Sequence, residues 1–235
     1  MALALAVGCP PGGYQLASAV YAYFRWADDV VDAPDRDAST VQSFMDRQAA
    51  IIQGSATPEH PAERALRWSL THPGMGPRLQ PAVERMAEAL FYDAQRDAGP
   101  IPAADLQQQV ERIGDAFVGA IWVCSGARGV PSAAALLLAR AATATHMLRD
   151  RAEDQALGYS NLPREHFGAT APPQGPGLQA WLEERTAEVD GWFAQGLDGV
   201  ASIQPTRTRR LVRLLGERYR KTLHGLSKSA GDQPS

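Results

Sequence analysis

The sequence has little of what marks secreted, membrane-spanning or disulfide-stabilised proteins. Only two cysteines, Cys9 and Cys124, occur in 235 residues; they are too few for a disulfide framework and lack the spacing of a metal site. No run of 18 or more apolar residues occurs, because the longest candidate, 133–148, is interrupted by an arginine and a histidine. The apolar stretch 2–7 has no basic lead and runs into a Pro-Gly cluster, which disfavours a signal peptide. These absences predict a cytoplasmic protein without stable membrane insertion.

An excess of charge of one sign is also missing. Lysine and arginine total 23 and aspartate and glutamate total 26, which gives a net charge of -3. Because there is no basic surplus, neither nucleic acid nor an anionic membrane surface is an expected partner.

Alternating runs rich in Val, Ile and Thr, the pattern of half-buried strands, are almost absent, whereas helical patterns are abundant. No repeat or linker divides the chain, so we expect one domain over 1–228 and a flexible tail at 229–235. The expected fold class is all-α, with roughly seven or eight helices around a central core. The predicted helices cover 14–32, 39–54, 61–70, 79–97, 103–126, 131–158, 178–199 and 205–226.

The first chemical motif is an acidic cluster at the end of the first predicted helix, where residues 25–32 read R-W-A-D-D-V-V-D. Asp28 and Asp32 are four residues apart and therefore share a helix face, with Asp29 beside them. Three crowded carboxylates repel one another unless a cation compensates them, and hard oxygen ligands suit Mg²⁺ shared with a substrate phosphate. Arg25 lies one turn before Asp28, where its guanidinium can bind a phosphate oxygen.

The second motif is a polar stripe on a helix otherwise rich in alanine and leucine. His146, Asp150 and Asp154 recur at intervals of four, with Arg149 beside them. Because the stripe begins within an apolar stretch, we expect it to point inward. A single acidic cluster is usually a solvated helix face, but two with the same spacing, each beside an arginine, favour a paired metal and phosphate site.

Such a pair suits the ionisation of an allylic diphosphate. Breaking its carbon–oxygen bond leaves an allyl cation and inorganic diphosphate, and Mg²⁺ neutralises the charge that builds on the leaving group. Arginines share that role, and an apolar cavity keeps water from the cation. No nucleophile triad or glycine-rich nucleotide loop competes with this interpretation.

These motifs resemble those of a known enzyme family. Residues 21–32 (Y-A-Y-F-R-W-A-D-D-V-V-D) resemble the first aspartate motif of the squalene and phytoene synthase family. Residues 148–154 (L-R-D-R-A-E-D), followed by Leu162 and Pro163, resemble its second, and the similarity extends over roughly 2–226. The resemblance implies the isoprenoid synthase fold, a single-domain helical bundle with both motifs facing a central cavity.

The resemblance also implies a Mg²⁺ cofactor and roles for particular side chains. The metal would be bound by Asp28, Asp32, Asp150 and Asp154, with Asp29 as a further ligand. The diphosphate would be reached by Arg25, Arg149 and Tyr219. Members of the family join two long prenyl diphosphates head to head.

Several residues depart from the family pattern. The family's asparagine before the second motif is His146 here, and Asn161 replaces a tyrosine before the Leu-Pro pair. In the middle helix, a stretch with Asp115 and Phe117 stands where the family has a Tyr-Cys pair. These changes fall at positions tied to the second diphosphate.

Large side chains are expected to shorten the substrate pocket, although ordinary core packing is the alternative for each ring. The expected pocket residues are Trp26, Phe117, Trp122 and Thr143. A shortened pocket suits a short allylic donor and a flat acceptor.

The preferred hypothesis is therefore transfer of a prenyl group to an electron-rich aromatic small molecule, such as a carbazole, in secondary metabolism. The ring proton would pass to Asp115, to His146 or to the released diphosphate. For His146, a structural hydrogen bond to a neighbouring carboxylate is the alternative. Three other functions remain open: a head-to-head synthase that joins two prenyl diphosphates, a terpene cyclase, and a helical scaffold whose acidic helices bind a partner.

Overall fold

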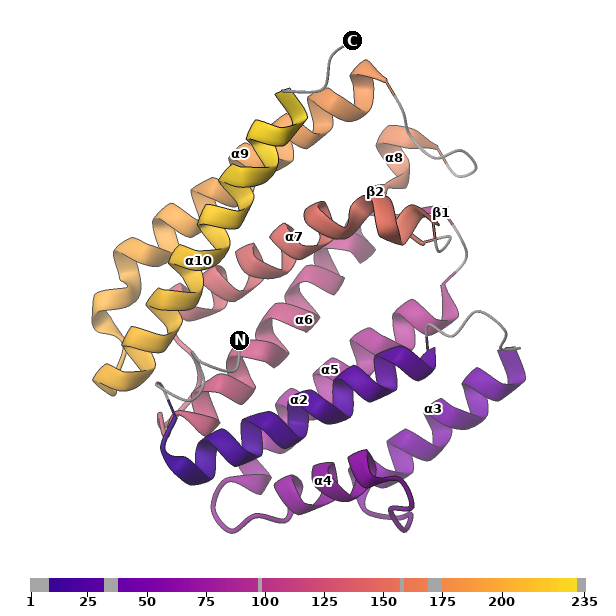
Figure 1. The fold of residues 1–235 in the computed structure, drawn as a ribbon, viewed down its shortest axis with the longest axis vertical. Coiled ribbons are helices and arrows are strands. Elements are labelled where there is room, and N and C mark those ends of the chain that lie inside the picture. The colour runs from indigo at the N-terminus through magenta and orange to yellow at the C-terminus, as the bar shows by residue number, and fades with distance from the viewer. Residues whose placement is uncertain (1–8, 32–37, 97–98, 157–158, 169–174, 232–235) are drawn as a thin grey trace. The chain divides into compact units, whose positions relative to one another are not determined.

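The computed structural model describes residues 9–31, 38–96, 99–156, 159–168 and 175–231. In this part of the chain the regular structure is helical except for two short strands (Figure 1), which confirms the all-α fold class. The elements in chain order are α2 (Pro11–Val31), α3 (Ala38–Gln53), α4 (Pro61–Leu70), α5 (Gly76–Gln95), β1 (Gly99–Ile101), α6 (Ala103–Cys124), α7 (Ala133–Ala156), β2 (Tyr159–Pro163), α8 (Arg164–Phe167), α9 (Pro176–Gly199), the 3₁₀ turn η1 (Val200–Ser202) and α10 (Thr206–Gly231).

The strands and the shortest helix differ from the sequence-based prediction. β1 pairs with β2 in parallel, with Gly99 opposite Tyr159 and Pro100 opposite Ser160. Segments of three and five residues containing Gly, Pro and Asn are too short to show a period of two. Helix α10 continues to Gly231, so the first residues of the predicted tail are helical, and 232–235 lie outside the described residues.

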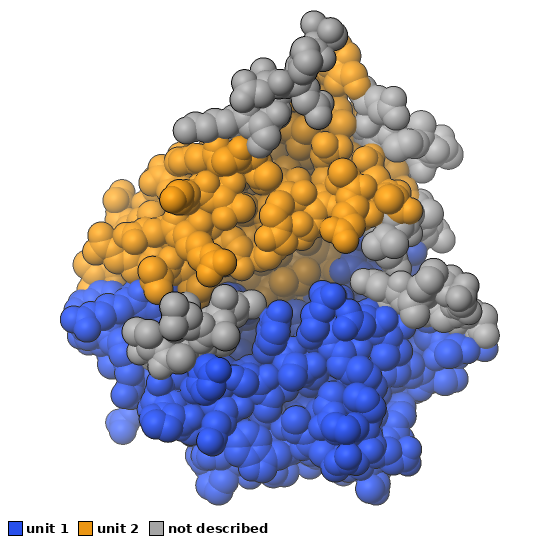
Figure 2. Space-filling model, in the orientation of Figure 1, with its two compact units in different colours: residues 1–96, 115–131, 204–211 blue, residues 97–114, 132–203, 212–235 orange. Residues whose placement is uncertain are grey.

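The chain forms two compact units (Figure 2). Unit 1 comprises residues 1–96, 115–131 and 204–211, and unit 2 comprises residues 97–114, 132–203 and 212–235. Helices α6 and α10 each contribute to both units.

Unit 1 is built around the packing of α2, α3, α4 and α5. The buried side chains of α2 recur every three or four residues at Leu16, Val20, Tyr23, Ala27 and Val31, the spacing of one helix face. Burial of each large side chain contributes roughly 1.5–3 kcal/mol. The opposite face of α2 is left for the polar residues of the first motif.

Close packing in unit 1 also requires a glycine at the start of α2. A Cβ at Gly13 would lie 1.8 Å from the carbonyl oxygen of Cys124. Because only glycine lacks that atom, it allows α2 to contact the end of α6.

Unit 2 holds the second motif on α7, which packs against α9. The buried residues of α7 run from Ala135 to Thr145 and are mostly alanine. A Cβ at Gly196 of α9 would lie 2.6 Å from Cγ of Leu138, so small residues let the two helices approach closely. The first half of α7 is thereby fixed, and its second half carries the motif.

Within the described part of the chain, none of the helices combines the length and the hydropathy that a membrane span needs.

Candidate active site

The first motif lies on the exposed face near the end of α2. Arg25 places its guanidinium 3.4 Å from Oδ2 of Asp28 and 2.9 Å from Oδ1 of Asp29. Asp28 is half-buried and Asp29 is exposed, so these one-turn ion pairs contribute little to stability. They leave two carboxylates and a cation together and accessible to a ligand. The predicted ligand Asp32 lies outside the described residues.

The second motif is more tightly organised. Asp150 accepts two hydrogen bonds from the Arg149 guanidinium, from Nε at 2.5 Å and Nη2 at 2.7 Å. These bonds, opposed by partial burial, lower the pKa of Asp150 below its ordinary value, so the carboxylate is ionised near neutral pH. Asp154, one turn further along α7, accepts a hydrogen bond of 2.9 Å from Nδ2 of Asn161 on β2. The β2 strand therefore fixes the orientation of this carboxylate.

His146 contacts a side chain that is distant in sequence. Its Nε2 lies 2.7 Å from Oη of Tyr219 on α10, and its Nδ1 lies 3.7 Å from Oδ2 of Asp150. The second distance exceeds that of a hydrogen bond, so the hydroxyl is the closer partner. Burial lowers the pKa of His146 and Arg149 lowers it further, against the opposing effect of Asp150. The imidazole is therefore neutral near pH 7.

A cavity of about 90 Å³ lies in unit 1 between α2, α5 and α6. Its wall is almost entirely apolar and includes Tyr21, Phe24, Met86 and Phe117. Asp115 lies two residues before Phe117 on α6, and its carboxylate lies 3.3 Å from Nη1 of Arg85. Such a cavity can hold hydrocarbon and exclude water.

The other residues predicted to line a pocket lie in packed surroundings. The Trp26 ring stacks on that of His60 with centroids 4.1 Å apart. Trp122 is 5% exposed and its indole N–H donates to the Arg128 carbonyl at 3.1 Å. Thr143 is buried on α7, where its hydroxyl donates to a carbonyl of its own helix. Of the four, Phe117 is the one that lines the cavity of unit 1.

The available oxygen ligands suit magnesium. Among the described residues no three His, Cys, Asp or Glu side chains converge as a metal-binding cluster. Mg²⁺, however, is commonly held by one or two carboxylates together with substrate phosphate and water. Each motif offers two described carboxylates, Asp28 with Asp29 and Asp150 with Asp154, and so fits that mode of binding.

Glu63, which was not predicted from the sequence, is a carboxylate in the first turn of α4 and is 1% exposed. It forms a capping box with His60, and Pro61 occupies the first turn. The H-P-A-E sequence carries this signal of a helix start. It gives no indication that the acid is buried.

The largely helical fold and the two aspartate motifs, each paired with an arginine, agree with the isoprenoid synthase fold that the resemblance implied. Two solved structures share the fold. A squalene synthase, HpnC from Alicyclobacillus acidocaldarius, is 21% identical with a TM-score of 0.68, over 96% of this chain and 87% of that chain. A dehydrosqualene synthase in complex with ligand is 21% identical with a TM-score of 0.70, over 97% of this chain and 81% of that chain.

The family model for squalene/phytoene synthase matches residues 8–233. The chain belongs to this family and is a prenyltransferase of it, which confirms the assignment made from the two motifs. No curated protein sequence matches the chain significantly. The narrower comparison with carbazole prenyltransferases stays a prediction.

Proposed function

We propose that the protein ionises an allylic prenyl diphosphate with the help of Mg²⁺ and joins the resulting cation to a carbon acceptor. One observation carries this proposal: in each of the two motifs an arginine pairs with an aspartate. The chain that holds these motifs belongs to the squalene/phytoene synthase family. When bound, Mg²⁺ would neutralise the charge that develops on the leaving diphosphate. Its ligands would be Asp28, Asp29, Asp150 and Asp154, with Asp32 as a further ligand.

The two arginines have a role that follows from their present contacts. In the structure, the guanidinium of Arg149 neutralises Asp150 and that of Arg25 neutralises Asp28 and Asp29. With Mg²⁺ held by these carboxylates, the guanidiniums of Arg25 and Arg149 would be available to donate to phosphate oxygens. The arginines thus hold the carboxylates ready before the substrate binds, and Tyr219 is a further candidate donor to the diphosphate.

For the acceptor, we propose a second prenyl diphosphate as the first candidate, which makes the reaction a head-to-head condensation. Support comes from the two similar structures, which are named a squalene synthase and a dehydrosqualene synthase. The apolar cavity beside Phe24 and Phe117 suits part of a prenyl chain.

An aromatic small molecule such as a carbazole is the second candidate acceptor. It is supported by the position of His146, whose Nε2 lies 2.7 Å from Oη of Tyr219 and whose Nδ1 faces Asp150 of the second motif. Attack on an aromatic ring requires loss of a ring proton, and a neutral imidazole can accept one. Asp115 is less suited to this role, because Arg85 already pairs with its carboxylate.

Product analysis separates these candidates. We expect purified protein with Mg²⁺ and farnesyl or geranylgeranyl diphosphate to release inorganic diphosphate and to form a product that contains two prenyl chains. If the aromatic candidate is correct, mass spectrometry should instead find one prenyl group on added carbazole and no dimeric product. A cyclic product from one diphosphate would identify a cyclase. Absence of Mg²⁺-dependent diphosphate release with geranyl, farnesyl and geranylgeranyl donors would contradict the proposed function.

A further inference from the structure

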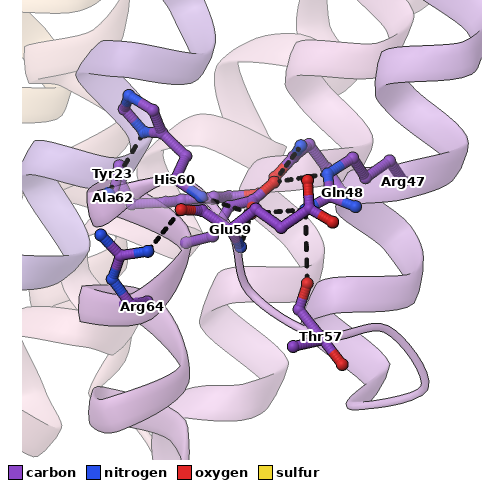
Figure 3. Close-up of polar contacts among 9 residues, drawn as sticks. Tyr23, Arg47, Gln48, Thr57, Glu59, His60, Ala62 and Arg64 are labelled. Carbon is purple, nitrogen blue, oxygen red and sulfur yellow. Dashed lines mark hydrogen bonds and ion pairs between the residues drawn. The ribbon is translucent and has the colours of Figure 1, made fainter.

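Glu63 accepts hydrogen bonds from several residues of a buried network in unit 1. Figure 3 shows other members of this network, among them Tyr23, Arg47 and Gln48. The Arg47 guanidinium donates to both carboxylate oxygens, at 2.9 and 2.8 Å. The side-chain amide of Gln48 donates at 3.1 Å, and the backbone N–H groups of Glu59 and His60 donate at 2.7 and 3.0 Å. The carboxylate thus joins α3 to the start of α4.

Two contacts extend this network to α2. Tyr23, which is 1% exposed, donates its hydroxyl proton to Oε1 of Gln48 at 3.1 Å. The ring of His60 stacks on that of Trp26, at an interplanar angle of 11°. These two contacts occur at residues on either side of Arg25, within five residues of Asp28 along the helix.

The charge of Glu63 determines how the rest of the network is oriented. Burial raises the pKa of Glu63, but the hydrogen bonds from Arg47, the two backbone amides and Gln48 outweigh it and lower the pKa to about 2. An ionised carboxylate only accepts hydrogen bonds. Gln48 must therefore turn its NH₂ group toward Glu63 and its oxygen toward Tyr23, which leaves the tyrosine hydroxyl as the donor.

We propose that Glu63 and Gln48 are positioning residues for the first aspartate motif. They fix the rotation of α2 through Tyr23 and thereby the direction in which Arg25 and Asp28 face their ligand. This inference rests on the proposed function of Asp28 as a ligand of the magnesium–diphosphate complex. The buried network differs from a simple helix-packing contact because its polar contacts reach α2 at Tyr23, just before the motif, and its ring contact reaches Trp26 within the motif.

The decisive variant is Tyr23→Phe, which removes one hydroxyl and leaves the pair of Arg47 and Glu63 in place. Binding of inorganic diphosphate in the presence of Mg²⁺ would be measured by calorimetry, together with the Tm of the ligand-free protein. We expect the dissociation constant to rise about fivefold, since small misplacements of binding groups are costly. Glu63→Gln should weaken binding similarly, because a neutral amide lets the Gln48 side chain flip.

Two controls separate positioning from loss of stability. Tyr14→Phe makes the same chemical change earlier on α2 and should leave binding unchanged. Ile51→Val, at a fully buried position of α3, should lower Tm without changing the dissociation constant. If Tyr23→Phe binds as tightly as the unchanged protein, the inference is wrong and the proposed function stands. If the unchanged protein does not bind diphosphate with Mg²⁺, the proposed function is wrong and the inference with it.

Discussion

Asp150→Asn should lower the rate of Mg²⁺-dependent diphosphate release by about a thousandfold. The substitution keeps the size of the side chain but removes the charge that pairs with Arg149 and that the proposed Mg²⁺ would require. The side chain of Asp150 is 35% exposed, and ion pairs at such positions contribute at most about 1 kcal/mol to stability. Loss of folding therefore cannot account for the loss of rate. Release of diphosphate from farnesyl diphosphate, followed at saturating substrate, is the measurement.

Asp198→Asn provides the matched control, because the same chemical change is made at an exposed position of α9. Its rate should equal that of the unchanged protein. Asp28→Asn should reproduce the effect of Asp150→Asn if both motifs act on the same leaving group. A rate for Asp150→Asn within threefold of the unchanged protein would remove this aspartate from the chemistry.

Glu63→Ala should lower the free energy of unfolding by about 3–5 kcal/mol. The substitution leaves the buried Gln48 amide and two part-buried backbone N–H groups without their acceptor, and it removes the partner of the partly exposed Arg47 guanidinium. Urea denaturation monitored by circular dichroism is the measurement. Glu59→Ala is the control: its carboxylate is 3.5 Å from Arg47 but its side chain is 78% exposed, so we expect a change within about 0.5 kcal/mol.

The same residue should make stability depend on acid pH. The pKa of Glu63 is about 2 in the folded protein, against an ordinary value of 4.5. Because folding lowers this pKa, the ionised carboxylate stabilises the folded state. The contribution is complete above pH 4.5 and is lost as the pH falls toward 2. It amounts to about 3 kcal/mol. Glu63→Gln should therefore flatten the decline in stability between pH 5 and 2; an unchanged decline would contradict the assigned pKa.

Local patterns in the sequence predicted the helices that carry the motifs. The stripe at Leu16, Val20 and Tyr23 has the period of a helix face, and the alanine-rich run of α7 predicts close packing before any partner is known. The motifs themselves were recognisable because their spacing of four is set by the helix. The strands β1 and β2 were not predicted, because each has too few residues to form a recognisable pattern.

Contacts between distant residues were not predictable in the same way. Glu63 lies 15 positions from Gln48, and Gln48 lies 25 positions from Tyr23. In sequence, an acid after a proline is an ordinary feature of a helix start. The pairing of His146 with Tyr219 spans 73 positions, and tertiary packing alone brings them together. Trp26 was predicted to line the pocket on size, but the position of His60, with which it stacks, could not be foreseen.

In the proposed reaction, the residues that select the acceptor differ from those that bind the leaving group. Both motifs would act on the diphosphate, so they would indicate the family without selecting the product. Selection would come from the apolar side chains of α2, α5 and α6 and from the residues around His146. Alanine, valine and phenylalanine at such positions are also what any helical core contains, which is why sequence alone left several acceptors open.

Thermal unfolding with Mg²⁺ and inorganic diphosphate, each alone and both together, tests whether the protein has a magnesium-dependent diphosphate site. A ligand that binds the folded state and is present at a hundred times its dissociation constant adds about 2.7 kcal/mol to the free energy of unfolding. In a protein of this size, that corresponds to a rise in Tm of roughly 5–10 °C. We expect Tm to rise by this amount only when both are present, and not in Asp150→Asn. A Tm that both together leave unchanged, or that diphosphate alone raises equally, would contradict a magnesium-dependent diphosphate site.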